Sequence, residues 1–179
     1  MKNSKNALVA LLAVLATGAV SAQSMTNQDY YGEVGYTALK FDDGSSTPTP
    51  KLARFVVGKN INENLALEGI ASFTVSKDTW REGVNSGELS GKHVGIYAKP
   101  KMEIAKDTEI FGRIGLSRTA WKSNSAAGDS NDSFTKIAYG VGLQTQFTKD
   151  VYGQVDYMAL GKKDGVSVKG FTVSVGTRF

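Results

Sequence analysis

The feature that most constrains the fold is an alternation of apolar with polar or small residues, repeated along most of residues 30–179. One such segment is FTKIAYGVGLQTQF, residues 134–147. Its odd-numbered positions include Ile137, Tyr139, Val141 and Leu143, whereas glycine, glutamine and lysine occupy even-numbered positions. We call each set of alternate positions a parity, because its side chains share one face of the strand. Successive side chains of a strand point to opposite faces, so this period of two predicts strands with one apolar face. The apolar face suits hydrocarbon, and the opposite face suits a crowded polar space.

Eight segments carry this pattern, and their connections are mostly long on one side and tight on the other. The expected strands are residues 30–41, 51–61, 65–75, 93–103, 108–121, 134–147, 151–160 and 166–179. Long connections are expected at 42–50, 76–92 and 122–133, and short ones at 62–64, 105–107, 148–150 and 161–165. A strand of about ten residues tilted near 40° rises about 25 Å, the height of a lipid-facing apolar band. The sequence therefore predicts an all-β fold, an eight-stranded antiparallel up-and-down transmembrane β-barrel.

The amino-terminal residues predict export. Lys2 and Lys5 precede an apolar run at 7–20, and VSAQ follows with small residues before a cleavage site between Ala22 and Gln23. This is the pattern of a secretory signal peptide, because the run is too short for a membrane anchor. We expect a cleaved signal peptide at 1–22 and a barrel domain at 23–179, so the mature protein starts at Gln23.

The charge balance argues against nucleic acid as a partner. Removing Lys2 and Lys5 from the 21 basic residues leaves 19, against 17 acidic residues, which is nearly neutral. Cysteine is absent, so disulfides do not hold this exported chain together.

The carboxy-terminal FTVSVGTRF, residues 171–179, keeps the strand pattern to its last residue. Hydrocarbon offers no water to an unpaired strand edge, so this strand must pair with both its predecessor and the first strand. Its outward residues are then Phe171, Val173, Val175 and Phe179.

Several of the strand positions that face inward are occupied by charged residues. We expect a lumen charge network, and its members are Glu33, Arg54, Glu68, Lys99, Arg113, Lys136 and Asp156. Opposite charges inside so narrow a barrel should pair and close it to water, because an isolated buried charge is costly. Removing Glu68 or Asp156 should destabilise the barrel by about 3 to 5 kcal/mol and raise its leak conductance.

Two further expectations concern aromatic residues and proline. Girdles of aromatic residues mark both edges of a lipid-facing band. One girdle should comprise Tyr31, Phe147, Tyr152 and Phe179, and the other Phe41, Trp80, Trp121, Phe134 and Tyr157. Pro100 lacks a ladder donor, so a bulge or an early strand end is expected there.

The stretches GEVGYTALKF, VVGKNINENLALEG, YGVGLQTQFTKDVYGQVDY and VSVGTRF resemble the small OmpA-like and OmpX/Ail-like eight-stranded outer-membrane barrels of Gram-negative bacteria. The resemblance spans residues 23–179. It implies that the barrel-assembly machinery recognises the last strand by its outward residues Phe171, Val173, Val175 and Phe179. It also implies outer-membrane lipid and lipopolysaccharide as partners, and periplasmic termini. Unlike for OmpA, no peptidoglycan-binding domain is expected after the barrel.

Enzymatic and ligand motifs are weak. GELSGKH, residues 87–93, has three residues between its glycines and ends in His93, so it fails as a phosphate-binding loop. His93 has the inward parity and is expected at the barrel rim. GDSNDS, residues 128–133, lacks a distal glutamate for calcium and is expected to be a turn-rich loop. We expect no catalytic residue, no cofactor and no metal.

The sequence thus favours a non-enzymatic, monomeric outer-membrane barrel whose loops contact the exterior, with a role in envelope integrity or adhesion and an extracellular ligand that the loops do not identify. A narrow pore is the first alternative, and a lipid A-modifying enzyme is the second.

Overall fold

The computed structural model describes residues 29–82, 85–125 and 128–179, and the predicted signal peptide lies outside these residues. Nine strands form in this part of the chain: β1 (Tyr30–Asp42), β2 (Lys51–Asn62), β3 (Leu65–Ser76), β4 (Asp78–Glu82), β5 (Asn85–Ala105), β6 (Thr108–Ser125), β7 (Gly128–Gln146), β8 (Val151–Lys163) and β9 (Val166–Arg178). All neighbouring strands are antiparallel, in the order β3-β2-β1-β9-β8-β7-β6-β5-β4, and β3 also pairs with β5.

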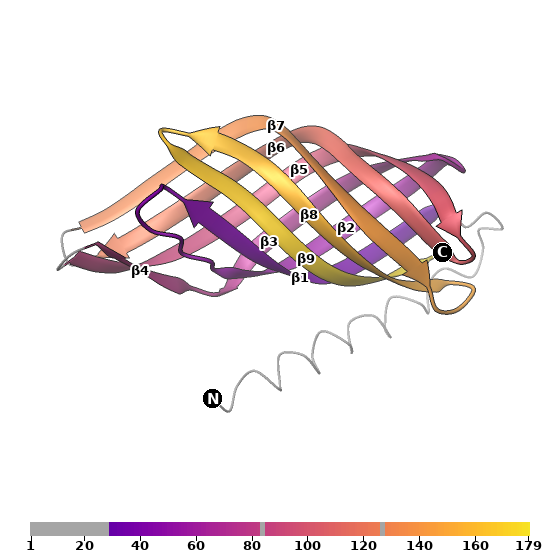
Figure 1. Ribbon diagram of the computed structural model, residues 1–179, viewed down its shortest axis with the longest axis horizontal. Coiled ribbons are helices and arrows are strands. Elements are labelled where there is room, and N and C mark those ends of the chain that lie inside the picture. Colours follow the sequence, from indigo (N-terminus) through magenta and orange to yellow (C-terminus); the bar gives the residue numbers. More distant parts are fainter. Residues whose placement is uncertain (1–28, 83–84, 126–127) are drawn as a thin grey trace, which may run out of the picture.

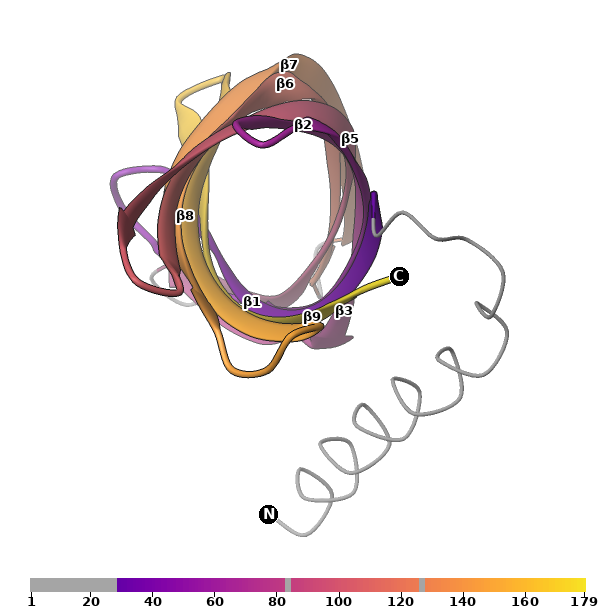
Figure 2. The same cartoon turned by 90° about the vertical axis from the view of Figure 1, so that its right-hand side faces the viewer.

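The β3–β5 pairing closes eight strands into a ring (Figure 2), and β4 pairs with β5 alone. The last strand completes this ring, as predicted: β9 pairs with β8 and, from Tyr31↔Arg178 to Asp42↔Ser167, with β1. Beyond the ladder, the amide of Phe179 donates to the carbonyl of Tyr30 at 2.9 Å. The predicted eight-stranded antiparallel barrel is confirmed.

The two ends of the barrel differ in their connections (Figure 1). At the turn end, which carries both termini of the described barrel, residues 63–64, 106–107 and 147–150 form short turns. At the opposite end, which we call the hairpin end, β4 to β7 run beyond the rest of the wall. β4 pairs with β5 from Asp78↔Leu89 to Glu82↔Asn85, and β6 pairs with β7 out to Ser125↔Gly128.

The predictions of long loops at 76–92 and 122–133, and of a turn-rich loop at 128–133, were wrong for this reason. In the residues of these segments that the structure describes, nearly all of the backbone lies in strands of a projecting sheet, and residues 128–133 begin β7. The alternation of apolar and polar residues reports one buried face. Strands that stand in solvent are polar on both faces, so this sequence signal is missing although the backbone ladder continues.

Pro100 also departs from expectation, because β5 passes through it without a bulge. The β5–β6 register is the same at Ala98↔Ile114 and at Lys101↔Phe111, on both sides of the proline. The missing donor interrupts only the β5–β6 ladder, which has no paired positions between these two pairs, whereas on the β3 side the amide of Lys101 still donates to the carbonyl of Asn64 at 2.9 Å.

Candidate functional site

Side chains fill the barrel interior in two layers of opposite character. The polar layer, nearer the turn end, is built on Glu33, Arg54, Glu68, Lys99, Arg113 and Asp156, each 2 or 3% exposed. The apolar layer consists of Leu39, Phe41, Leu52, Val56, Ile70, Leu89, Tyr97, Phe134, Ala138, Met158, Leu160 and Val168. It lies nearer the hairpin end, except that Val56 is paired with Glu33 on the turn side of Arg54. The centre of the ring, drawn empty in Figure 2, is therefore occupied by side chains.

Arg113 is the hub of the polar layer. Its Nε donates to Glu68, and its Nη2 lies 3.1 Å from Glu68 Oε1, so the two groups pair through two hydrogen bonds. Arg113 Nη1 lies 3.0 Å from Asp156 Oδ2, and Nη2 lies 3.5 Å from Glu33 Oε2. A single guanidinium thus contacts three carboxylates that come from three other strands.

Lys99 and Arg54 complete the charge pairing. Lys99 Nζ lies 3.2 Å from Glu68 Oε1 and 3.5 Å from Glu33 Oε1. Arg54 Nη1 lies 2.9 Å from both oxygens of Asp156 and donates to Thr172 Oγ1 at 2.9 Å. The layer therefore holds three cations and three carboxylates, which satisfies the requirement that buried charges be paired.

Two tyrosines orient the carboxylates. Tyr31 donates its hydroxyl to Glu68 at 2.7 Å, and Tyr152 donates to Glu33 at 2.9 Å. Each ring lies over a glycine in the neighbouring strand, Tyr31 over Gly58 and Tyr152 over Gly176. A Cβ at Gly58 would lie 2.1 Å from the Tyr31 ring, and one at Gly176 would lie 2.3 Å from the Tyr152 ring. These positions therefore require glycine for close approach.

Amide side chains satisfy further atoms of the same layer. Gln154 Nε2 donates to Glu33 Oε2 at 2.7 Å. Lys99 Nζ donates to Gln144 Oε1 and to Gln154 Oε1, each at 3.2 Å. These glutamines and tyrosines were not predicted as members of the lumen network, although all of them have the inward parity.

The apolar layer is capped by aromatic rings. Trp121 contacts Phe41 and Phe134, with ring centroids 5.8 Å apart in both pairs. Trp80 packs against the same cluster and donates its Nε1 to Ser123 Oγ at 2.8 Å. A cavity beside Arg54 and His93 measures about 10 Å³, near the lower limit for one water molecule. The interior is closely packed between the two layers.

The structure brings together six of the seven residues expected in the lumen network, and Lys136 is the exception. Lys136 is exposed, although it has the inward parity. Among the described residues, the backbone ladder between β7 and β8 stops at Tyr139↔Ala159, and beyond it β8 lies against Lys136 through Gly161, which has no side chain to cover the lysine. Lys136 is not part of the network, and the remaining six charges balance.

The expected aromatic girdles require a larger correction. Tyr31, Tyr152, Phe41 and Phe134 are buried inside the barrel, and Trp80 and Trp121 pack on the apolar layer. Phe147, Tyr157 and Phe179 face outward, with 45 to 66% of each exposed. The prediction took account of the height of each residue along its strand but not of the face to which its side chain points. Tyr31, for example, has the same inward parity as Glu33.

In the terminal strand, Phe171 and Val173 are about half exposed, Val175 is partly exposed, and all three face outward.

His93 lies inside the barrel and is not at a lipid-facing serine. Its Nε2 is 2.7 Å from the Tyr97 hydroxyl, and its ring is 5% exposed. Among the described residues, no group of three histidine, aspartate or glutamate side chains is arranged to hold a metal ion. The described residues also contain no helix long and apolar enough to cross a membrane.

Comparison with known proteins finds one family and many similar folds. Residues 10–179 match the family described as outer membrane protein beta-barrel domain. No curated protein sequence matches the chain closely enough to count as a relative.

Solved structures of small barrels cover nearly the whole described chain. Ail of Yersinia pestis, in complex with the heparin analogue sucrose octasulfate, has a TM-score of 0.62 at 22% identity, over 84% of this chain and 97% of that chain. Neisserial surface protein A has a TM-score of 0.66 at 14% identity, again over 84% and 97%. The amino-terminal barrel domain of Pseudomonas aeruginosa OprF has a TM-score of 0.58 at 13% identity, over 83% and 97%. At these identities the likeness concerns the fold.

Proposed function

Because the chain belongs to the outer membrane protein β-barrel domain family, we propose that it is a non-enzymatic surface protein of the Gram-negative outer membrane. Its barrel is a closed anchor, and its hairpin end binds an extracellular ligand or surface, in adhesion or in maintenance of the envelope. The hairpin end faces outward from the cell, and both barrel termini lie in the periplasm.

The observation that carries this proposal is the projecting sheet of β4, β5, β6 and β7. β4 pairs with β5 alone, and the backbone ladder between β7 and β8 begins only at Tyr139↔Ala159 within the described residues. In the part of the sheet that the structure describes, two edges therefore have no neighbouring strand, and an extended segment of another protein can add to them. The likeness to Ail, solved with a sulfated heparin analogue, makes an anionic glycan a second candidate ligand.

The filled interior supports an anchor over a pore. A water-conducting path would have to cross a layer of paired charges and then a layer of packed apolar side chains. We propose that the protein conducts no steady current, because both layers lie in series along the same narrow lumen.

Export and assembly complete the proposal. The segment 1–22 is removed at Gln23, and the barrel-assembly machinery reads the outward Phe171, Val173, Val175 and Phe179. Deleting Phe179 should lower the outer-membrane level and raise periplasmic degradation. The protein acts as a monomer in contact with outer-membrane lipid and lipopolysaccharide.

Shortening the projecting hairpin tests the surface role. Lys122 is paired with Asn131, so residues 122–131 can be replaced by an Asn-Gly turn that joins Trp121 to its partner Asp132. We expect loss of adhesion to host cells and of binding to immobilised heparin. A control that removes residues 43–46 from the β1–β2 loop should keep both activities.

Gel mobility before and after boiling checks that each variant is a folded barrel. Unchanged adhesion and heparin binding by a folded variant would contradict the proposal. Large steady conductance of the purified protein in a planar bilayer would favour the pore, and an altered lipid A mass spectrum on expression would favour the enzyme.

A further inference from the structure

The outer wall has different chemistry at its two edges. At the hairpin end, six outward strand positions carry basic residues: Lys40, Lys51, Lys92, Arg118, Lys122 and Lys169. At the turn end, outward positions carry apolar residues that are 40 to 66% exposed, namely Ile61, Met102, Ile104, Ile110 and Phe147. Lys59, over the Tyr30 ring, is the one outward cation of the described strands at the turn end. A wall whose cations are concentrated at one edge suits a bilayer whose anionic headgroups are concentrated in one leaflet.

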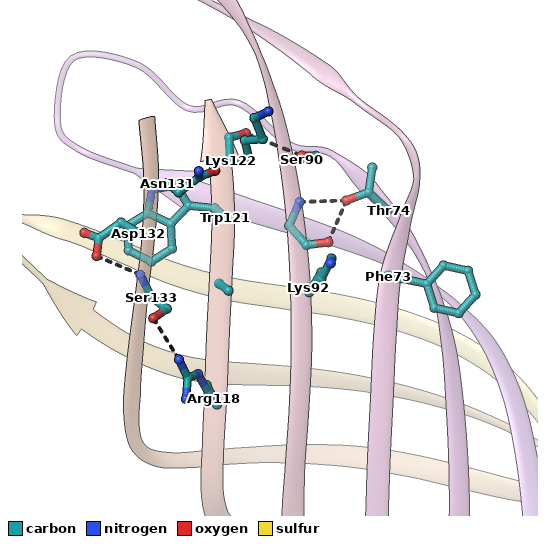
Figure 3. A pocket seen from close by; sticks show the side chains of 12 residues that line it. Phe73, Thr74, Ser90, Lys92, Arg118, Trp121, Lys122, Asn131, Asp132 and Ser133 are labelled. Carbon is teal, nitrogen blue, oxygen red and sulfur yellow. Dashed lines mark hydrogen bonds between the residues drawn. The ribbon is translucent and has the colours of Figure 1, made fainter. Parts of the chain in front are cut away.

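Three of these cations line a groove of about 590 Å³ on β3, β5, β6 and β7 (Figure 3). Lys92 pairs with Ala120, which lies between Arg118 and Lys122 on β6. Lys92 is therefore the diagonal neighbour of both, at a spacing of about 7 to 8 Å that long side chains bridge. Ser90, Asn131 and Ser133 add polar groups to the same groove.

The carboxylates near this groove already have partners. Asp132, which lines it, is bonded to Lys163 of β8, and this bond holds the pKa of Asp132 below its usual range. Lys122 lies 2.8 Å from the exposed Asp129, and Arg118 Nη2 lies 3.4 Å from Ser133 Oγ. Lys92 and Arg118 are exposed, so the groove retains a net attraction for anions.

An apolar track continues from the groove toward the turn end. A second hollow, of about 570 Å³, shares Arg118 with the first and is lined by Phe55, Ala71, Val94 and Leu116. A third, of about 490 Å³, shares Gly69, Ile96 and Leu116 with the second. Small residues form the floor, since a Cβ at Gly69 would have no contact closer than 3.9 Å.

We propose that this continuous groove is a binding site for one bisphosphorylated, acylated glucosamine disaccharide, the lipid A class of glycolipid. Lys92, Arg118 and Lys122 bind the phosphates, the serine and asparagine side chains bind sugar hydroxyls, and acyl chains lie over Gly69. Three cations beside several neutral polar groups fit a multiply charged sugar better than the single phosphate of a glycerophospholipid. The inference rests on the proposed placement in the outer membrane.

Native mass spectrometry of the folded barrel in detergent tests the site, with bisphosphoryl lipid A, monophosphoryl lipid A and phosphatidylglycerol as probes. Wild-type protein should retain one bisphosphoryl lipid A in preference to the other two. The variant with Lys92→Gln, Arg118→Gln and Lys122→Gln should bind it roughly 100-fold more weakly, given a contribution from each cation near an anionic surface. The matched control, Lys40→Gln, Lys51→Gln and Lys169→Gln on the opposite wall, should bind as wild type does.

The apolar track is tested with glycines that face outward. Gly69→Leu fills the groove and should weaken binding, whereas Gly32→Leu on β1 should not, since a Cβ at Gly32 meets only ordinary contacts at 3.7 Å. Equal losses in the two triple variants, or equal retention of phosphatidylglycerol, would overturn the site. A wild-type protein whose gel mobility is unchanged by boiling would overturn the membrane placement and the site with it, whereas a folded wild type without lipid A preference would overturn the site alone.

Discussion

The two layers of the barrel interior fill the same space by different physical means. In the polar layer, Arg113 contacts three carboxylates, and each carboxylate has at least one further partner. In the apolar layer, Phe41, Trp121 and their neighbours meet through van der Waals contact. We therefore expect the stability that a polar-layer residue contributes to depend on the identity of its partners. The stability that an apolar-layer residue contributes should depend on the volume that it fills.

The largest effect is expected from Arg113→Met in the polar layer. This substitution leaves Glu33, Glu68 and Asp156 short of a buried cation, so we expect a loss of about 3 to 5 kcal/mol in the free energy of unfolding. Glu68→Gln should also be costly although the shape is unchanged, because it removes the charge that pairs with Arg113. Urea unfolding in lipid vesicles, followed by tryptophan fluorescence, measures both. A loss below about 1 kcal/mol for Arg113→Met would mean that water reaches the layer.

The apolar layer should respond to volume. Leu39→Ala should cost about 2 to 5 kcal/mol through the cavity that it leaves, whereas the volume-conserving Leu39→Met should cost less than about 1.5 kcal/mol. The same unfolding assay applies. Equal losses for Leu39→Ala and Leu39→Met would show that shape complementarity, and not volume, controls this layer.

Double-mutant cycles sharpen the comparison further. Glu33→Gln with Arg113→Met should show a coupling of about 0.5 to 3 kcal/mol, because the two residues belong to one network. Glu33→Gln with Phe41→Leu should be additive within about 0.5 kcal/mol, since the two positions are about 26 Å apart along β1. Strong coupling in the second pair would mean that the two layers act as one unit.

Conductance measurements test which layer closes the lumen, because an ion crossing the barrel would have to pass both layers in turn. Wild-type protein and Glu68→Ala should both show little current, because the apolar layer still seals the lumen. From the sequence alone, Glu68→Ala is expected to raise the leak. Because the apolar layer also fills the lumen, we expect a larger leak from a variant that opens both layers, such as Glu68→Ala with Phe41→Ala. Planar-bilayer recordings compare the three proteins, and a leak through Glu68→Ala alone would show that the polar layer is the seal.

The smallest effect is expected outside the lumen, at the bond between Lys163 and Asp132 that joins the β8–β9 hairpin to the projecting sheet. This bond lowers the pKa of Asp132 and raises that of Lys163. The stabilisation that Asp132 contributes is therefore present above its ordinary pKa of about 4 and is lost as the pH falls through its lower pKa in the folded protein. The stabilisation that Lys163 contributes is lost only above about pH 10. Amide exchange in β7 should be slower in wild type than in Lys163→Met at pH 7 and equal in the two at pH 2. A difference that persists at pH 2 would assign the effect to packing.

The sequence by itself determined which face each residue takes. Alternation with a period of two is local, so it placed Glu33, Arg54, Glu68, Lys99, Arg113 and Asp156 on the inner face and Phe171 and Val173 on the outer face without any knowledge of their partners. It also required closure, because hydrocarbon cannot satisfy an open strand edge. The eight barrel strands follow from these two facts.

Tertiary structure decided which inward residues meet and where the wall ends. Tyr31 reaches Glu68, and Arg54 reaches Asp156, across strands that are far apart in sequence, and the stagger of the closed barrel sets these heights. Lys136 has the inward parity but lies beyond the described end of the β7–β8 ladder, against Gly161. Apart from Trp80 and Leu89, the described residues of the projecting strands are polar on both faces, and pairing with neighbouring strands keeps them extended. Parity is a property of a single strand, whereas partners and strand ends depend on the pairing of several strands at once.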